Sequence, residues 1–163
     1  MDITLVITGG TIDKTYHPLK GELGFDTSIS QLPNMIEQAN LSDTITCHQL
    51  FLIDSLEMTQ QHRETLLKHC QNIESDKILI SHGTDTMAET AVFLDQHIRD
   101  KTLVLFGAMI PYALKGSDAL FNLGTAMAHV QQQPVGCYVS MNGRIFAADS
   151  VSKNTDKGVF ETK

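Results

Sequence analysis

Five short runs of apolar and β-branched residues recur along this chain, and the stretches between them have the spacing of helices. The runs cover Ile3–Ile7, Thr44–Leu50, Lys77–Ile80, Thr102–Phe106 and Val135–Ser140. Runs that are almost continuously apolar indicate strands buried on both faces, as in parallel sheets. Because these strands alternate with helices, we expect an α/β fold with a mostly parallel central sheet and helices on both faces.

Four stretches are predicted to be helical from the spacing of their apolar residues. They cover residues 30–39, 59–73, 86–98 and 117–130. The third begins Thr86-Met87-Ala88-Glu89, which predicts a capping box with Thr86 at the N-cap and Glu89 three residues later. The chain has 163 residues and shows neither an internal repeat nor a linker. We therefore expect residues 1–163 to form one domain.

The composition argues against several classes of protein. A formal net charge of -7 at pH 7 repels phosphate backbones, so we expect no nucleic-acid partner. No apolar run approaches the roughly 20 residues needed to span a bilayer, so we expect no membrane partner. The N-terminus lacks the basic region of a signal peptide, and the three cysteines lack any C-x-x-C spacing. These features favour a cytoplasmic protein with reduced thiols.

Polar and glycine-rich segments follow four of the predicted strands at the points where the strands end. They read T-G-G-T (residues 8–11), I-D-S (53–55), S-H-G-T-D-T (81–86) and G-A-M-I-P (107–111). In open α/β sheets, ligands bind outside the carboxyl ends of the strands. We therefore expect these four loops to gather at one edge of the sheet and to form the functional site there.

The residues in these loops allow several kinds of chemistry. Gly9 and Gly10 would let backbone amides approach a ligand closely, although a tight turn explains them equally well. A hydroxyl beside a carboxylate, as in Thr84-Asp85, suits nucleophilic catalysis once a base completes the set. Ser55 alone is more typical of a turn or cap. Because G-x-S-x-G, H-E-x-x-H and phosphate-loop motifs are absent, we expect no serine hydrolase, metal site or cofactor.

Taken together, the loops resemble the bacterial-type L-asparaginase (asparaginase/glutaminase) family. The resemblance covers essentially the whole chain, in order. Two of its motifs are highly specific in combination, T-G-G-T-I at residues 8–12 and H-G-T-D-T-M at residues 82–87. Further matching motifs are D-S-L-E-M (54–58), G-A-M-I-P (107–111), F-N-L (121–123) and V-S-K-N-T-D (151–156). The fold implied is the flavodoxin-like N-terminal domain of that family.

The resemblance also implies an activity and a set of site residues. The implied reaction is hydrolysis of the side-chain amide of L-asparagine, or of a related small amide, to the acid and ammonia through an acyl-enzyme. Thr11 matches the nucleophile, and Tyr16 matches a tyrosine on a mobile loop over the site, here Lys14–Phe25. The implied catalytic residues are Thr11, Thr84, Asp85, Lys153 and Tyr16; the implied substrate-binding residues are Gly10, Ser55, Thr84, Asp85 and Ala108.

General chemistry is consistent with these roles. A threonine hydroxyl is a poor nucleophile until a base takes its proton. A lysine can be that base only when neutral, a state that desolvation favours and that a neighbouring carboxylate such as Asp85 opposes. Asp85 is therefore expected mainly to orient groups and to bind the substrate's amino group. Without the resemblance, Lys153 would be interpreted as a surface lysine.

Two departures from the family leave an alternative open. Family members normally continue into a second, smaller domain, which we expect this chain to lack, and Leu56 stands where a polar residue is common. The alternative is a non-catalytic or weakly active module that binds an amino acid or amide. A nucleotide-binding switch is a third interpretation, without a phosphate motif in its favour. Because family sites are completed across a subunit contact, we expect a homodimer or higher homo-oligomer.

Overall fold

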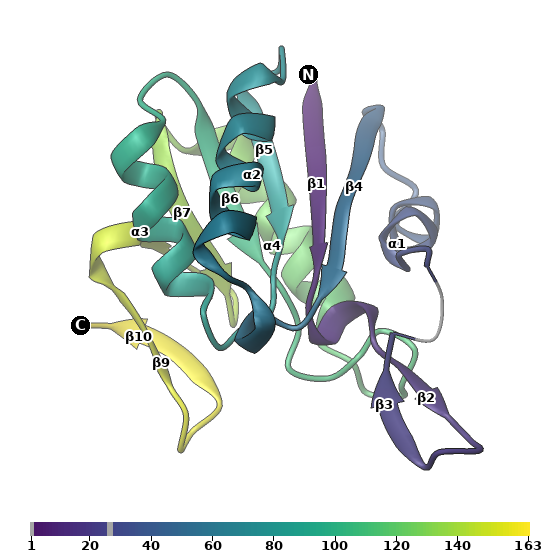
Figure 1. Ribbon diagram of the computed structural model, residues 1–163. Coiled ribbons are helices and arrows are strands. Elements are labelled where there is room, and N and C mark those ends of the chain that lie inside the picture. Colours follow the sequence, from purple (N-terminus) through teal and green to yellow (C-terminus); the bar gives the residue numbers. More distant parts are fainter. Residues whose placement is uncertain (1, 26–27) are drawn as a thin grey trace.

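The computed structural model describes residues 2–25 and 28–163 and places a six-stranded sheet at the centre of the molecule (Figure 1). The strand order is β4-β1-β5-β6-β7-β8, with β8 antiparallel to β7 and the other neighbouring pairs parallel. The strands are β1 (Ile3–Gly9), β4 (Ile45–Ile53), β5 (Lys77–Ser81), β6 (Thr102–Phe106), β7 (Gly136–Met141) and β8 (Arg144–Ala147). The predicted mostly parallel sheet is confirmed, and β8 is an addition to the five expected strands.

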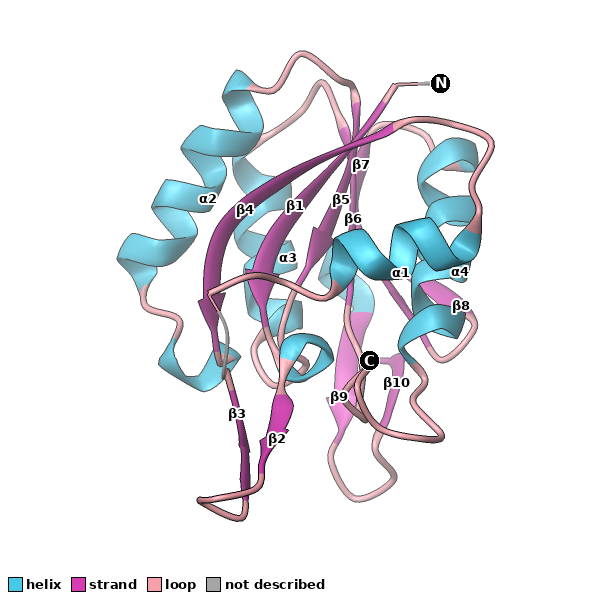
Figure 2. Cartoon of the chain, turned by 90° about the vertical axis from the view of Figure 1, so that its right-hand side faces the viewer, coloured by secondary structure: helices cyan, strands magenta, loops and turns pink. Residues whose placement is uncertain are grey.

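Helices cover both faces of this sheet, as expected (Figure 2). One face is covered by α2 (Gln60–Asn72) and α3 (Met87–His97), whose Leu66 and Leu94 are fully buried against it. The other face is covered by α1 (Leu32–Ala39) and α4 (Ala119–Gln132). None of the helices in the described residues is both long and apolar enough to cross a membrane.

Outside the six-stranded sheet, the described residues form two separate hairpins and three 3-10 turns, which the sequence pattern does not predict. The hairpins are β2–β3 (Thr15–His17 with Glu22–Gly24) and β9–β10 (Val151–Asn154 with Val159–Thr162). Figure 1 shows both hairpins beyond the carboxyl ends of the parallel strands, on opposite sides of that edge. The turns are η1 (Thr11–Asp13), η2 (Ser55–Glu57) and η3 (Ala148–Ser150). The expected mobile loop over Lys14–Phe25 is therefore largely a β-hairpin.

The predicted capping box at the start of α3 is wrong. Thr86 is the N-cap residue of α3, but its side chain makes no cap hydrogen bond. Its hydroxyl instead donates to the backbone carbonyl of Ser55 at 2.9 Å, and Glu89 forms an ion pair with Arg63 at 3.2 Å. The reason is tertiary: the Ser55 loop packs beside the start of α3 and offers an acceptor that the sequence pattern does not reveal. A capping box is present at α2, between Thr59 and His62.

Close contacts at glycines hold the four predicted loops together. A methyl group on Gly10 would lie 2.5 Å from the amide nitrogen of Gly83, and one on Gly83 would lie 2.6 Å from Cβ of Ser55. One on Gly107 would lie 2.3 Å from the carbonyl oxygen of His82. Since no side chain fits at these points, the backbone of each glycine packs directly against the neighbouring loop. The expected convergence of all four loops at one edge is confirmed.

His82 fills the space beneath this loop cluster. Its side chain is fully buried, and its backbone amide donates to the carbonyl of Phe106 at 2.9 Å. Its Nδ1 lies 2.7 Å from the carbonyl oxygen of Gly83, and its Nε2 lies 3.1 Å from Sδ of Met58. Burial lowers the pKa of His82 to about 4. The histidine is therefore a neutral packing residue at physiological pH.

We expect Gly83→Ala to destabilise the fold, because the new methyl would meet Ser55 at 2.6 Å. Overpacking of this kind typically lowers the free energy of unfolding by about 1–3 kcal/mol. Gly124→Ala is the matched control, since Gly124 lies within α4 with nothing within 4 Å of an added methyl. That change should raise the free energy by about 0.5–1 kcal/mol. Urea unfolding measures both; an equally stable Gly83→Ala protein would contradict the close loop contact.

The buried His82 should make stability depend on pH. Its folded pKa of about 4 is below the ordinary 6.5, so the unfolded chain binds the proton more readily. The contribution of neutral His82 to the free energy of unfolding is complete above pH 6.5. It is lost as the pH falls toward 4, by about 3 kcal/mol over that range. The free energy of unfolding, measured in urea, should therefore fall less between pH 7 and pH 4 for His82→Gln than for the wild type. Equal differences in the two proteins would be inconsistent with a buried neutral histidine.

Candidate active site

Lys153, Thr84 and Asp85 form the centre of the candidate active site. The ammonium nitrogen of Lys153 donates to Oγ1 of Thr84 at 2.8 Å and to Oδ1 of Asp85 at 2.6 Å. Thr84 is buried, whereas the side chain of Asp85 is 42% exposed and that of Lys153 is 13% exposed. Thr84 and Asp85 follow β5, and Lys153 is on β9, some 70 residues further along the chain. The C-terminal hairpin therefore delivers a cation to the loop that follows a central strand.

Ser55 connects this group to the second loop. The residue is buried and starts the η2 turn, with Asp54 between it and the end of β4. Its Oγ accepts a hydrogen bond from the backbone amide of Asp85 at 3.2 Å, and its carbonyl accepts from the hydroxyl of Thr86. The Ser55 side chain is thus held next to the Asp85 backbone.

Thr11 lies in the η1 turn, immediately after two glycines with left-handed backbone angles. Gly9 has φ 97° and Gly10 has φ 89°, which glycine adopts without the steric cost that other residues incur. The amide of Gly10 donates to the carbonyl of Ile53 at 2.9 Å. Gly10 packs on Gly83. Thr11 follows Gly10 and Thr84 follows Gly83, so both threonines lie next to this backbone contact. The structure therefore brings the loops of the two threonines into contact.

Lys14 and Asp54 are two site neighbours that sequence reasoning missed. The Lys14 ammonium forms an ion pair with Oδ2 of Asp54, while Oδ1 of Asp54 accepts from the amide of Leu56 at 3.0 Å. Burial would raise the pKa of Asp54, but the hydrogen bonds from Lys14 and Leu56 and the charges of Lys14 and Lys153 lower it. The available signal was the Asp-Ser pair after a strand, since aspartate commonly caps the next turn.

Tyr16 and Ala108 are placed differently from the other expected site residues. Tyr16 is 55% exposed on β2, opposite Leu23 in a hairpin that extends away from the sheet (Figure 1). Covering the site with Tyr16 would therefore require the hairpin to move. Ala108 is buried with its methyl in the core on the α1 and α4 face. Any contact of Ala108 with a ligand would therefore have to come from its backbone.

A cleft of about 550 Å³ borders the Lys153–Asp85 pair. Its lining comes from α3 and from the C-terminal segment, and it combines apolar Val92 and Val151 with charged Lys163 and Glu89. Thr11 and Ser55 do not line this cleft. The cleft therefore flanks the group of Lys153, Thr84 and Asp85 on the side away from the Thr11 loop.

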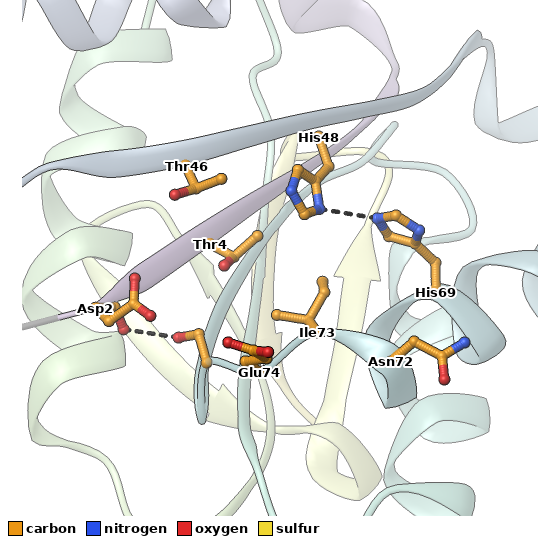
Figure 3. Close-up of a pocket in the computed structure, with 9 residues that line it drawn as sticks. Asp2, Thr4, Thr46, His48, His69, Asn72, Ile73 and Glu74 are labelled. Atoms are coloured by element: carbon orange, nitrogen blue, oxygen red, sulfur yellow. Dashed lines mark hydrogen bonds between the residues drawn. The ribbon is translucent and has the colours of Figure 1, made fainter.

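A second cavity of about 320 Å³ lies at the opposite, amino-terminal edge of the sheet (Figure 3). It contains a pair of imidazoles, with Nδ1 of His48 3.1 Å from Nε2 of His69. Burial and the neighbouring His48 lower the pKa of His69. Within residues 2–25 and 28–163, no group of three or more His, Cys, Asp or Glu is placed to hold a metal ion. Because it lies at the amino-terminal ends of the strands, this cavity is separate from the candidate active site.

Known proteins resemble this chain in sequence over nearly its whole length. A family model described as "Asparaginase, N-terminal" matches residues 2–160. The chain is 34% identical to "Probable L-asparaginase periplasmic" of Haemophilus influenzae, over 97% of this chain and 48% of that protein. It is 32% identical to "L-asparaginase 2" of Escherichia coli, over 99% of this chain and 49% of that protein.

Solved structures show the same fold. The thermostable L-asparaginase from Thermococcus kodakarensis matches with a TM-score of 0.84 at 26% identity, over 99% of this chain and 51% of that one. The probable cytoplasmic L-asparaginase from Campylobacter jejuni matches with a TM-score of 0.80 at 31% identity, over 99% and 52%. The chain thus spans about half the length of the relatives it matches. With nearly every residue covered by the family model, the chain belongs to the asparaginase family and corresponds to its N-terminal domain.

Proposed function

We propose that this chain is an amidohydrolase that cleaves the side-chain amide of L-asparagine, or of a related small amide, through a threonine nucleophile. The observation that carries the proposal is the pair of hydrogen bonds from Lys153 to Thr84 and Asp85. That group lies beside the Gly10–Gly83 contact, which brings the Thr11 loop to the same edge. A hydroxyl, a basic side chain and an orienting carboxylate are the parts that acyl transfer requires.

The proposed reaction proceeds in two steps. The Thr11 hydroxyl oxygen attacks the amide carbon and gives up its proton. The carbon–nitrogen bond then breaks, and the nitrogen leaves as ammonia with that proton. Water next attacks the acyl-enzyme, which releases the carboxylic acid and regenerates the threonine hydroxyl. Backbone amides at the glycine-rich strand exits are suitably polar to stabilise the oxyanion of each step.

In this proposal, Lys153 and Thr84 act as one unit in proton transfer. The 2.8 Å hydrogen bond fixes the Thr84 hydroxyl relative to the lysine nitrogen. Asp85 orients the lysine through its Oδ1 at 2.6 Å. Positioned acid–base groups of this kind typically contribute about 10²–10⁴-fold to a rate. Thr84 is buried, so its hydroxyl is shielded from competing water.

Substrate binding is assigned to groups around this unit. Ser55 and Asp85 are proposed to bind the α-carboxylate and α-amino groups of the substrate, with Gly10 and the Ala108 backbone beside them. Leu56, which follows Ser55, is 74% exposed and offers no hydrogen bond from its side chain. A missing polar contact typically weakens binding by about 1–3 kcal/mol. The exposed Tyr16 would act only after its hairpin closes over the site.

Leu56 also favours a second candidate function, a binding module for an amino acid or amide with little or no turnover. An apolar side chain at the rim weakens the grip on a charged substrate without removing the pocket. The intact Lys153–Thr84–Asp85 group supports catalysis over this alternative, because binding alone does not require a lysine bonded to a buried threonine.

Self-association and a cytoplasmic location belong to the same proposal. Met109, Ile110 and Phe121 are exposed apolar residues around the fourth loop, and apolar surface of this kind supports a homodimer or higher homo-oligomer. Cys47, Cys70 and Cys137 are all free thiols, which is consistent with a reducing compartment. Relatives carry the names periplasmic and cytoplasmic alike. The cytoplasmic location is therefore proposed from the free thiols.

We expect wild-type protein to release ammonia from L-asparagine or L-glutamine, and Thr11→Ala to lower the rate by at least about 10³-fold because the nucleophile is lost. Thr84→Val and Lys153→Met should each lower it by about 10²–10³-fold through loss of proton transfer. An ammonia-release assay on L-asparagine, L-glutamine and D-asparagine measures these rates.

Thr65→Ala is the matched control, since Thr65 is on α2 with its hydroxyl bonded to its own helix at Gln61. This variant should keep the wild-type rate, and circular dichroism checks the folding of all four variants. Full activity in a folded Thr11→Ala protein would contradict the proposed nucleophile. Aspartate binding by calorimetry without ammonia release from any of the three amides would support the binding module instead.

A further inference from the structure

The Asp13 carboxylate, two residues after Thr11, is buried and joins two distant parts of the chain. The residue is 6% exposed, and its Oδ1 accepts hydrogen bonds from the Ser30 hydroxyl and from the backbone amide of Gln31, both at 2.7 Å. Two donors on one carboxylate oxygen make charge-assisted hydrogen bonds, which are stronger than neutral ones. Asp13 therefore ties the η1 turn to the start of α1.

Ser30, the partner of Asp13, is itself firmly held. Its side chain is buried, and its Oγ accepts a hydrogen bond from the amide of Leu32 at 3.0 Å at the beginning of α1. Its own amide donates to Oε1 of Gln49 at 2.9 Å, on the edge strand β4. Through Ser30, the Asp13 carboxylate is therefore connected to the edge strand β4 and to the start of α1.

The turn that carries Thr11 is held on its other sides as well. Ile12 is fully buried in the core, and its carbonyl accepts from the amide of Tyr112 at 3.2 Å. The amide of Asp13 donates back to the carbonyl of Gly10 at 3.1 Å, which closes the turn around Thr11. The hydrogen bonds to the Asp13 carboxylate differ from these contacts, because they involve a side chain and reach the segment that follows the β2–β3 hairpin.

We call the hydrogen bonds from Ser30 and Gln31 to the Asp13 carboxylate the clamp. Along the chain, the β2–β3 hairpin lies between Asp13 and Ser30. The chain leaves Asp13 through Lys14 into β2 at Thr15, and Ser30 follows the end of β3 at Gly24. The second carboxylate oxygen of Asp13 is buried without a hydrogen-bond partner among the described residues, and burial raises the pKa of this group. A buried carboxylate oxygen without a hydrogen bond lowers the free energy of unfolding, which points to a role for this carboxylate other than general stability.

We propose that Asp13 is a positioning residue for the nucleophile: its carboxylate fixes the Thr11 turn to Ser30 and holds the base of the hairpin on which Tyr16 lies. This inference rests on the proposed function for the role of Thr11, whereas the clamp itself does not. Because a misplacement of about 1 Å can lower a rate by about 10²-fold, a loosened turn should act mainly on kcat.

The first test is hydrogen exchange, without substrate, on wild type, Asp13→Ala, Ser30→Ala and the double variant. Amides in residues 11–14 and 15–24 should exchange at least tenfold faster in Asp13→Ala, and Ser30→Ala should show a smaller increase. The double variant should match Asp13→Ala, since both changes remove the same contact. Asp13→Asn, which keeps an oxygen acceptor, should restore most of the protection.

Asp95→Ala is the matched control, because Oδ1 of Asp95 also accepts from a backbone amide, that of Cys137 at 3.1 Å, away from the Thr11 turn. It should leave exchange in residues 11–24 unchanged. Unchanged exchange in both Asp13→Ala and Ser30→Ala would overturn the clamp, whether or not the chain hydrolyses any amide. Ser30→Ala keeps this test decisive if Asp13→Ala does not fold.

The second test is the split between kcat and KM in the ammonia assay. Asp13→Ala should lower kcat at least tenfold and change KM less than threefold, and Asp13→Asn should recover most of the loss. Faster exchange with an unchanged kcat, or with a change in KM alone, would overturn the link to Thr11. If wild type releases no ammonia, the proposed function fails separately, and the exchange result still decides the clamp.

Discussion

The site depends on the backbone contact between Gly10 and Gly83, which are on the first and third loops of the sheet edge. Parallel strands bring the loops to the same edge, but only residues without side chains allow them to touch. Gly83 in turn packs against Ser55, so the same geometry fixes the second loop. Thr11, Thr84 and Ser55 are therefore placed by close packing of the main chain, with the neutral His82 filling the space below.

The cation reaches this edge by a different route. Lys153 is on a hairpin whose Val151 and Phe160 are buried in the same core as α3. Apolar packing thus places the hairpin, and the hydrogen bonds from Lys153 to Thr84 and Asp85 complete the group. Lys14, paired with Asp54 on the other side, carries a second cation to the same edge. The edge therefore combines both signs of charge, as a site for a zwitterionic amino acid would require.

The sequence was sufficient to predict the sheet and the converging loops, because buried parallel strands have a clear apolar pattern that ends where polar loops begin. Lys153 could be assigned only by resemblance, since no local pattern shows that its hairpin folds back onto α3. The capping box at Thr86 was wrong because its hydroxyl found a carbonyl on another loop. The Asp13–Ser30 contact was missed for the same reason: both residues have ordinary turn chemistry, and only tertiary packing brings them together.

We propose that Thr11 is the nucleophile at this sheet edge, and trapping of the acyl-enzyme would test this role directly. The protein would be mixed with L-asparagine, quenched rapidly in acid and digested, and its peptides would be analysed by mass spectrometry. We expect an aspartyl ester on the peptide that contains Thr11 and none on the peptide that contains Thr84. An ester on Thr84, or ammonia release with no ester on either threonine, would contradict it.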